Sequence, residues 1–401
     1  METPKPRHTR RHVMASLLGA GATATLASEI IAGADSPGRE VADRASSIRL
    51  TALVPHVCGD RIYLELKTNH SIRGWGEIKG VWPKVAAQLT REMFALLDGK
   101  NPTHIEDIWQ SLYRAHRNHR GGPFMVHCIS GIDNALWDIA GKLWGVPVYR
   151  LLGGPVRKKI RYYPHAKAVK LGSAQRPHAG DPAEVQQLVE QVRSARKGVG
   201  PDGTVMYDAH SAIPPALLQQ FATAIEPYDL LFIEEPAVPG NVDVFKRIHE
   251  KINVPIATGE RVRTIWEVLP YLNAQAVDIL QPDAGYTGGI SQMKKIAALA
   301  EAHYVPLAPH CTQSYLGQAA SLHCTASIPL FLIHEAYNDP HLGRIVRRSW
   351  EADDEGYYSL PEGPGVGVEI DEAALAKEAA NPKYQFRWRD ERFPDGSVTD
   401  Y

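Results

Sequence analysis

The chain has 401 residues, 44% of them hydrophobic, and a formal net charge of −1 at pH 7. A chain of this length can bury a large core and is expected to form two domains. Its balanced charge lacks the basic excess typical of nucleic-acid-binding proteins, and its neutral pI gives no electrostatic reason for a membrane or polyanion partner.

Residues 1–34 differ from the rest of the chain. Arg10 and Arg11 precede a short Gly- and Ala-rich apolar run, which ends near the small-residue pattern at 32–34. This segment resembles a twin-arginine export signal, and its apolar part is too short for a membrane span. We therefore expect a periplasmic or otherwise exported protein, with a polar linker over residues 35–47.

The next hundred residues predict an α+β domain. Apolar and polar residues alternate as in antiparallel hairpin strands in three segments, 48–57, 61–69 and 73–78. Helical periodicity follows in three more, 85–99, 105–117 and 128–145. The last helix is expected to end at Gly145, which suits a C-cap.

A β/α barrel is predicted after this domain. Six short apolar runs each end in a polar residue, and these residues recur roughly every 25 positions, the length of a strand plus a helix. They are Asp208, Glu234, Glu260, Asp283, His310 and Glu335. Because the carboxyl ends of parallel barrel strands form one rim, we expect these side chains to meet in one mouth.

Three successive members of this series are carboxylates. Asp208, Glu234 and Glu260 would repel one another at close range unless a cation lay among them. A site made only of oxygen donors favours Mg²⁺. The sequence therefore predicts a magnesium site at the barrel mouth.

The start of the barrel is irregular. The first strand is expected at 160–166 and the second at 168–172, with Lys167 alone between them. A parallel crossover needs a dozen or more residues, usually a helix. The first barrel helix is thus predicted to be missing. Either the two strands connect in an unusual way, or one is not a barrel strand, or the chain has lost a segment and the site is compromised.

The motifs at the strand ends resemble a known family. They are D-x-H at 208–210, I-E-E-P at 233–236, G-E-R at 259–261, Q-P-D at 281–283 and P-H at 309–310. The chain is similar over about residues 48–375 to the enolase superfamily, in its mandelate racemase subgroup, and most of all to acid-sugar dehydratases of the galactonate dehydratase kind. The resemblance implies a modified TIM barrel at 156–345, an N-terminal α+β capping domain at 48–155 and a C-terminal return to that domain at 346–401.

The resemblance also implies roles for individual residues. Asp208, Glu234 and Glu260 would bind Mg²⁺. Asp283 would orient His310, the general base that takes the proton α to the substrate carboxylate, and the ene-diolate formed would be stabilised by the metal. His210, two residues beyond Asp208 and therefore expected on the same side of the strand, would be the opposing general acid.

Glu335, Lys170 and Arg261 complete the expected site as substrate-binding residues. Lys170 stands where racemases of this subgroup carry the first lysine of a K-x-K pair, and Gly172 replaces the second. Asp283 stands where the lactonising subgroup carries a lysine. Both departures rank dehydration above racemisation and lactonisation.

The resulting hypothesis is a carbon–oxygen lyase, an Mg²⁺-dependent dehydratase that converts a sugar acid such as galactonate to a 2-keto-3-deoxy acid. The alternatives are a racemase or epimerase of the same superfamily, or an exported barrel that binds a sugar acid or a metal without turnover. The resemblance suggests a homo-oligomer. The four cysteines, Cys58, Cys128, Cys311 and Cys324, show no metal-type spacing, and either free thiols or disulfides fit the sequence.

Overall fold

The computed structural model describes residues 45–115, 117–172, 182–337 and 342–382, and in the tail 385–387, 392 and 395–398. The chain divides into two compact units, Met1–Ser46 and Ser47–Tyr401, and the fold below is that of the second unit. The predicted export signal and most of the predicted linker lie outside the described residues. None of the described helices combines the length and hydropathy needed to span a bilayer.

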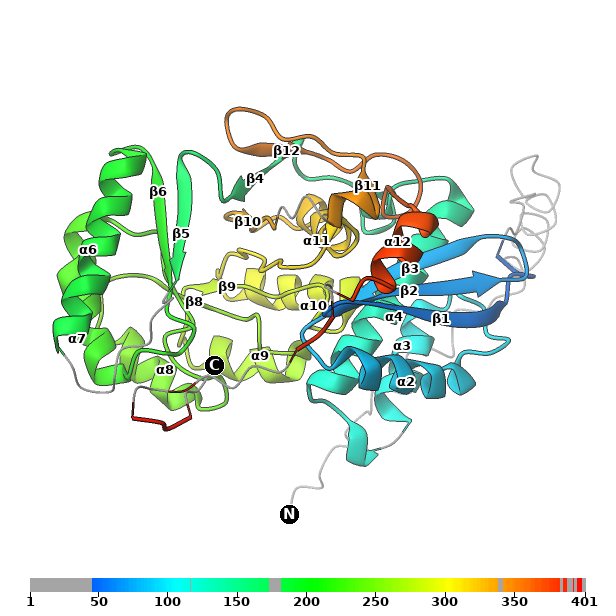
Figure 1. Cartoon of the computed structure of the whole chain (residues 1–401), viewed down its shortest axis with the longest axis horizontal. Coiled ribbons are helices and arrows are strands. Elements are labelled where there is room, and N and C mark those ends of the chain that lie inside the picture. Colours follow the sequence, from blue (N-terminus) through cyan, green and yellow to red (C-terminus); the bar gives the residue numbers. More distant parts are fainter. Residues whose placement is uncertain are drawn as a thin grey trace, which may run out of the picture. The chain divides into compact units, whose positions relative to one another are not determined.

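The second unit begins with the predicted capping domain, coloured blue to cyan in Figure 1. Its sheet is an antiparallel meander in the order β1-β2-β3. The strands are β1 (Leu50–Cys58), β2 (Arg61–Thr68) and β3 (Arg73–Ile78). The helices are α2 (Pro83–Met93), α3 (Ile105–Arg114), α4 (Pro123–Trp144) and the short α5 (Val148–Leu151). Short 3₁₀ turns lie at Phe94–Leu96 and Arg117–His119.

Glycine allows the close packing of α4 against β3. A Cβ atom at Gly76 would lie 2.0 Å from the carbonyl oxygen of Gly131, and one at Gly74 would lie 2.1 Å from that of Ala135. Only glycine permits this approach of strand to helix. The helix ends where the sequence predicts, because Gly145 adopts the left-handed conformation with φ 70° and caps it.

The barrel is built on a parallel sheet in the order β5-β6-β7-β8-β9. These strands are β5 (Ala168–Gly172), β6 (Thr204–Asp208), β7 (Ile233–Glu234), β8 (Ile256–Thr258) and β9 (Ile279–Leu280). Parallel bridges from Leu280 to Leu307 and from Leu307 to Phe331 continue the wall. Beyond them, β10 (His334–Glu335) pairs in parallel with β4 (Lys159–Tyr163).

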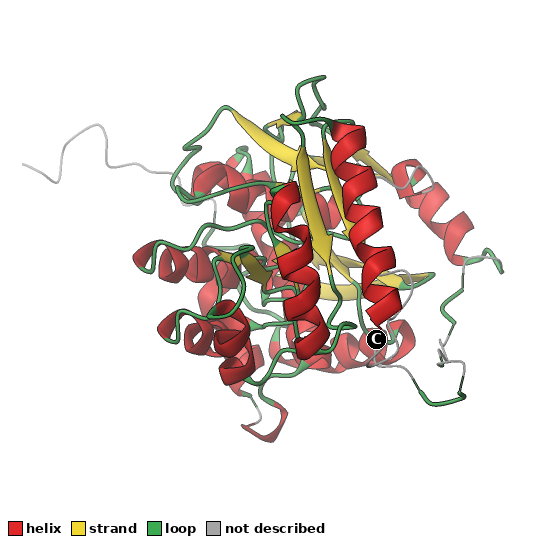
Figure 2. Cartoon of the chain, turned by 90° about the vertical axis from the view of Figure 1, so that its left-hand side faces the viewer, coloured by secondary structure: helices red, strands yellow, loops and turns green. Residues whose placement is uncertain are grey.

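Helices cover the outside of this wall. They are α6 (Pro182–Val199), α7 (Pro215–Ile225), α8 (Val242–His249), α9 (Thr264–Asn273), α10 (Gly289–Ala302) and α11 (Tyr315–Ser327). A 3₁₀ turn, Glu226–Tyr228, follows α7. Figure 2 shows helices of this layer running alongside the strands that they cover, and a large apolar core fills the layer between helices and sheet. A smaller apolar cluster, including Tyr163, Met206 and Phe232, fills the barrel interior. This packing leaves the polar strand ends as the barrel mouth.

The predicted absence of the first barrel helix is confirmed. Only residues 164–167 join β4 to β5, and the backbones of His165 and Ala168 exchange hydrogen bonds of 2.9 and 3.0 Å in a tight turn. On the edge away from β10, β4 pairs with the antiparallel strand β12 (Tyr357–Ser359). No ladder joins β4 to β5 in the described part of the chain, so the barrel wall is interrupted there.

The C-terminal segment serves both parts of the unit. Strand β11 (Val346–Arg348) follows the 3₁₀ turn Leu342–Arg344 and pairs with β13 (Val368–Ile370), while β12 joins the barrel strand β4. Helix α12 (Glu372–Ala379) packs against β1, and Glu372 pairs with Arg73 of the cap at 2.8 Å. The C-terminal segment therefore contacts the cap through α12 and contributes the strand β12 beside β4.

Candidate active site

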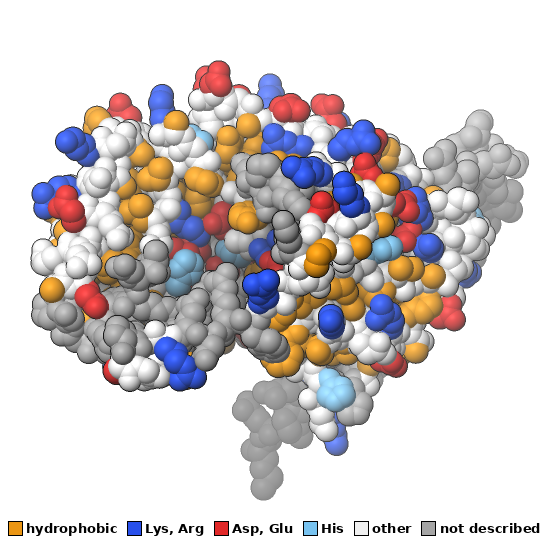
Figure 3. All heavy atoms as spheres, viewed as in Figure 1, with side chains coloured by type: hydrophobic (Ala, Val, Ile, Leu, Met, Phe, Trp, Pro, Cys, Tyr) orange, Lys and Arg blue, Asp and Glu red, His pale blue; other side chains and the backbone are white. Residues whose placement is uncertain are grey.

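The six polar residues predicted to meet do lie at the carboxyl ends of the barrel strands. Asp208, Glu234 and Glu335 are the last residues of β6, β7 and β10. Glu260 follows β8, Asp283 follows β9, and His310 follows the bridge at Leu307. All six residues except Glu260 are buried. Figure 3 shows histidine, acidic and basic side chains gathered in a hollow near the middle of the face in view.

The predicted dyad of His310 and Asp283 is formed. The Nδ1 of His310 lies 2.6 Å from Oδ2 of Asp283. Asp283 is held in turn by the amide of Gln313 at 2.8 Å and the backbone N–H of Gly285 at 2.6 Å. With Nδ1–H bound to the aspartate, the other ring nitrogen of His310 is the one available for proton transfer.

That other nitrogen, Nε2, faces carboxylates. It lies 3.1 Å from Glu260 and 3.7 Å from Glu335. Burial alone would lower the pKa of His310, but Glu260, Glu335 and Asp283 outweigh burial and raise the pKa to about 10. A base with acidic neighbours of this kind holds an abstracted proton strongly.

Lys170 lies among the predicted metal ligands. Its Nζ is 2.8 Å from Glu234, 3.2 Å from Asp208 and 2.8 Å from Glu335. Burial works against its charge, but these carboxylates raise the pKa of Lys170 well above its ordinary range. The ammonium thus offsets part of the negative charge at the centre of the mouth.

Each of the three predicted metal ligands forms an ion pair with a basic side chain. Asp208 and Glu234 pair with Lys170, and Glu260 pairs with His310. Among the described residues, no group of three or more His, Cys, Asp and Glu side chains is arranged to hold a metal ion.

The chemistry of the donor set nevertheless fits a hard divalent cation. All donors are carboxylate oxygens, and Oε1 of Glu234 is buried without a hydrogen-bond partner within the described residues. Burial, and then the charge of Asp208, raises the pKa of Glu234 well above its usual range. A further cation bound by Asp208, Glu234 and Glu260 would satisfy this oxygen and offset the repulsion.

His210 reaches the mouth by a different route from the one expected. Strand β6 ends at Asp208, so the alternation of side chains along a strand does not extend to His210. Its backbone is left-handed, with φ 45°, and its Nε2 lies 2.9 Å from Oδ2 of Asp208. A hydrogen bond from the His210 backbone N–H to Oδ1 of Asp208, at 2.9 Å, fixes this turn.

Arg261, in the loop after β8, contacts residues in the loops after β6 and β7. It binds Glu235 through two nitrogens, at 2.8 and 2.6 Å, and donates to Oγ of Ser211 at 2.6 Å. Burial and the charge of Glu260 raise the pKa of Glu235 to about 7 against the effect of Arg261. These contacts point to a positioning residue, whereas the sequence suggested a substrate-binding one.

The capping domain contributes residues that the sequence did not single out. Lys79 donates from Nζ to the carbonyl oxygen of Thr312 at 2.7 Å, and the ring of His127 stacks on Tyr286 with centroids 4.3 Å apart. Tyr286 lies 5.7 Å from the ring of His310. Contacts between the cap and the barrel leave no periodic signal in the sequence, although Lys79 directly follows the predicted third strand.

A buried carboxylate of the cap, Glu77, binds the start of α11 in the barrel. Glu77 of β3 accepts from the backbone N–H of Ser314 at 3.0 Å and of Gly317 at 3.3 Å, at the start of α11, and it also pairs with Arg61 at 2.9 Å. Because α11 begins just after His310, this contact sets the cap beside the dyad.

All four cysteines are buried and free. The backbone N–H of Cys311 donates to Oε2 of Glu335 at 3.0 Å, and burial raises the pKa of the Cys311 thiol well above its usual range. A thiol nucleophile is therefore not part of this site.

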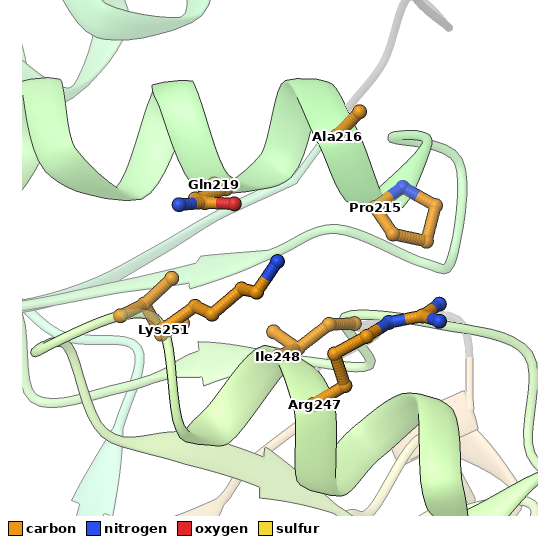
Figure 4. Close-up of a pocket in the computed structure, with 7 residues that line it drawn as sticks. Pro215, Ala216, Gln219, Arg247, Ile248 and Lys251 are labelled. Carbon is orange, nitrogen blue, oxygen red and sulfur yellow. The ribbon is translucent and has the colours of Figure 1, made fainter.

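A separate cavity of about 470 Å³ lies between α7 and α8 (Figure 4). Its lining includes Arg247 and Lys251, but no carboxylate or histidine. It therefore offers no acid–base pair for proton abstraction.

Comparison with known proteins agrees with this geometry. Residues 157–374 match the family model of the enolase C-terminal domain-like proteins, and residues 57–153 match the N-terminal domain of the mandelate racemase and muconate lactonizing enzymes. The chain belongs to this family, within the enolase superfamily.

Several relatives carry a more specific name. A D-galactonate dehydratase of Ralstonia pickettii is 35% identical over 375 residues, which cover 85% of this chain and 96% of the relative. One of Xanthomonas euvesicatoria pv. vesicatoria is 33% identical over 393 residues, covering 88% and 100%.

Solved structures show the same architecture. A mandelate racemase/muconate lactonizing enzyme from Sulfitobacter sp. superposes with a TM-score of 0.78 at 29% identity, over 84% of this chain and 97% of that one. A member of the enolase superfamily from Salmonella Typhimurium gives a TM-score of 0.78 at 26% identity, over 82% and 98%.

Proposed function

We propose that this protein is an Mg²⁺-dependent dehydratase that removes water from a sugar acid, an aldonate such as galactonate, to give a 2-keto-3-deoxy acid. The observation that carries the proposal is the His310–Asp283 dyad, at 2.6 Å, facing the carboxylates of Glu260 and Glu335. The names of the relatives support the class, because a D-galactonate dehydratase is a hydro-lyase. Sugar-acid dehydration in general rests on these relatives, whereas the metal and the individual steps are our inference.

Asp208, Glu234 and Glu260 would hold the ion, which when bound supplies positive charge to the substrate's carboxylate as the α-proton leaves. His310 would take that proton through Nε2, while Asp283 keeps Nδ1 protonated and favours the imidazolium. The departing β-hydroxyl would receive a proton from His210 and leave as water. The resulting enol then becomes the 2-keto product by proton transfer to C3.

The interrupted barrel wall favours a second candidate, a barrel that binds a sugar acid without turnover. The break between β4 and β5 lies directly beside Lys170, so a lost segment could have disabled the site while the ligand set stayed in place. The ordered contacts of Lys170 and the intact dyad favour the enzyme.

The deciding experiment is a turnover screen of sugar acids with the full-length protein and Mg²⁺, detecting 2-keto-3-deoxy acids. We expect turnover that is lost in His310→Asn and in Glu234→Gln. The matched controls are His303→Asn and Glu301→Gln, at the C-terminal end of α10, and both variants should retain activity. A folded protein that binds Mg²⁺ but turns over no acid would contradict the dehydratase and favour the binding protein.

We also propose export by the twin-arginine pathway, supported by Arg10 and Arg11 before the apolar run. Replacing both by lysine should retain the protein in the cytoplasm of its host, as measured by cell fractionation. Export of the double variant at the wild-type level would contradict this proposal.

A further inference from the structure

One side-chain amide contacts both oxygens of the Asp283 carboxylate. The Nε2 of Gln313 lies 2.8 Å from Oδ1 and 2.9 Å from Oδ2. Because an ionised carboxylate only accepts hydrogen bonds, the amide presents its NH₂ group to Asp283. Oδ2 also accepts from Nδ1 of His310, and Oδ1 from the backbone N–H of Gly285. Gln313 therefore helps to fix the rotation of the carboxylate that directs Oδ2 at the imidazole.

The Gln313 side chain lies in a space that two glycines keep open. A Cβ atom at Gly285 would lie 2.7 Å from Nε2 of Gln313, and one at Gly317 would collide with Cβ of Gln313. Gln313 itself is buried, with 1% of its surface exposed. A buried side chain confined in this way has little freedom to change rotamer. Packing therefore supports the contact between the amide and Asp283.

The capping domain holds the backbone on both sides of Gln313. Lys79 donates from Nζ to the carbonyl oxygen of Thr312 at 2.7 Å, and Glu77 accepts from the backbone N–H of Ser314 at 3.0 Å. Glu77 belongs to β3, and Lys79 is the residue directly after that strand. Because these two contacts lie on either side of a single residue, a shift of the end of β3 would displace the Gln313 amide and the carboxylate that it binds.

We propose that Gln313 is a positioning residue for the His310–Asp283 dyad, and that the cap keeps it in place through Lys79 and Glu77. This inference rests on the proposed function and deepens it, since it makes docking of the cap a condition for the reactive orientation of His310. Without the amide, the Asp283 carboxylate can rotate about its last torsion, which has broad preferences, so Nδ1 of His310 loses a fixed partner. Misplacing a proton-transfer group in this way costs about 10- to 100-fold in rate.

The first test is a proton NMR signal of the full-length protein that needs no turnover. The Nδ1 proton of His310, in a hydrogen bond of 2.6 Å, should resonate well downfield of the backbone amides, and its absence in His310→Asn identifies it. We expect Gln313→Met, which keeps a side chain of similar length but no donor, to lose this resonance through exchange with water. Gln313→Asn, whose amide is one methylene shorter, should lose it too and replaces the methionine variant if that one does not fold. The control is Gln318→Met in α11, a buried glutamine whose amide has no hydrogen-bond partner among the described residues, and it should keep the resonance.

Kinetics on the substrate found in the screen are the second test. Gln313→Met should lower kcat about 10- to 100-fold with little change in KM, because it disturbs the base and leaves the substrate's own contacts in place. Lys79→Met should weaken the His310 resonance and lower kcat in the same direction. Adding Lys79→Met to Gln313→Met should lower kcat no further, since both changes act on the same carboxylate.

An unchanged His310 resonance in Gln313→Met, or its equal loss in Gln318→Met, would overturn the inference. Effects of Lys79→Met and Gln313→Met on kcat that simply multiply would overturn it as well, because Lys79 would then act independently of Gln313. The two proposals fail separately. Turnover at the wild-type rate in Gln313→Met leaves the dehydratase intact and removes the positioning role. A His310 resonance that depends on Gln313 and Lys79, in a protein that turns over no acid, supports the positioning role and contradicts the dehydratase.

Discussion

The ammonium of Lys170 lies 2.8 Å from Oε2 of Glu234, and this ion pair joins the middle of β5 to the end of β7 across β6. It spans the part of the barrel next to the interrupted wall. Asp208 and Glu335 share the same ammonium. One cation therefore holds three buried carboxylates together, and its removal should be felt in stability as well as in substrate binding.

We expect Lys170→Met to destabilise the metal-free protein by about 3–5 kcal/mol, because it leaves buried carboxylates without their partner. Mg²⁺ should restore much of this loss in the variant and stabilise the wild-type protein less. Thermal unfolding in EDTA and in Mg²⁺ measures both effects. The control is Lys167→Met, at the residue directly before β5, which should respond to Mg²⁺ as the wild type does. Equal Mg²⁺ effects in wild type and Lys170→Met would contradict the role of this ion pair.

Gly172 makes room for His210. A Cβ atom built on Gly172 would lie 3.3 Å from Cε1 of the His210 ring, which is tighter than ordinary van der Waals contact. We expect Gly172→Ala to displace the ring and to lower kcat about 5- to 20-fold with little change in KM, since a 1 Å displacement of an acid–base group is costly. Kinetics on the substrate found in the screen would measure this. In Gly198→Ala, where the added methyl meets nothing within 4 Å, kcat should stay unchanged. Equal kcat in both variants would remove His210 as the general acid.

Stability should fall on acidification because buried histidines are held neutral. Burial lowers the pKa of His323 in α11 from 6.5 to about 4, and its Nδ1 accepts from the backbone N–H of Tyr149 at 3.2 Å. Between these pH values the unfolded state binds the proton that the folded state does not. The free energy of unfolding therefore decreases as pH falls from 6.5 to 4, by about 3 kcal/mol for this residue.

Urea unfolding at pH 7, 5.5 and 4.5 tests this by difference. We expect His323→Gln to lose less stability between pH 7 and 4.5 than the wild type does, while His303→Gln, at the residue directly after α10, keeps the wild-type slope. Parallel curves for His323→Gln and wild type would show that His323 does not contribute to the acid sensitivity.

The sequence predicted the barrel well because two simple regularities coincide. Apolar runs at a strand-plus-helix spacing identify the strands, and the common rim of parallel strands brings Asp283 and His310 together. The missing helix was also predictable, since one residue cannot form a parallel crossover. These inferences need only local pattern and chain length.

The remaining features depend on contacts that sequence spacing does not encode. The pairing of β12 with β4 joins segments almost 200 residues apart. The turn that directs His210 back to Asp208 follows from a left-handed backbone at a residue that is not glycine. Lys79 reaches the carbonyl oxygen of Thr312, two residues beyond His310, because Glu77 docks the cap on the start of α11. Such relations come from tertiary packing, which overrides strand alternation and proximity along the chain.

Arg261 and Glu235 offer the sharpest test of positioning. The guanidinium binds the carboxylate through two nitrogens and also reaches Ser211, one residue beyond His210. Loss of these hydrogen bonds should make the positions of His210 and of the neighbouring Glu234 less fixed. We expect Arg261→Lys to lower kcat about 10-fold while KM changes less, because lysine keeps the charge but not the two parallel hydrogen bonds.

A double-mutant cycle separates positioning from a direct contact with substrate. If Arg261 acts through Glu235, then Arg261→Lys, Glu235→Gln and the double variant should lower kcat by similar factors, with a coupling of about 1–3 kcal/mol. Ser211→Ala, which removes only the hydroxyl contact, should give a smaller loss in the same direction. If Arg261 instead binds substrate, Arg261→Lys will raise KM with kcat largely kept, and its effect will add to that of Glu235→Gln. Independent, additive effects on KM would therefore return Arg261 to the substrate-binding role that the sequence suggested.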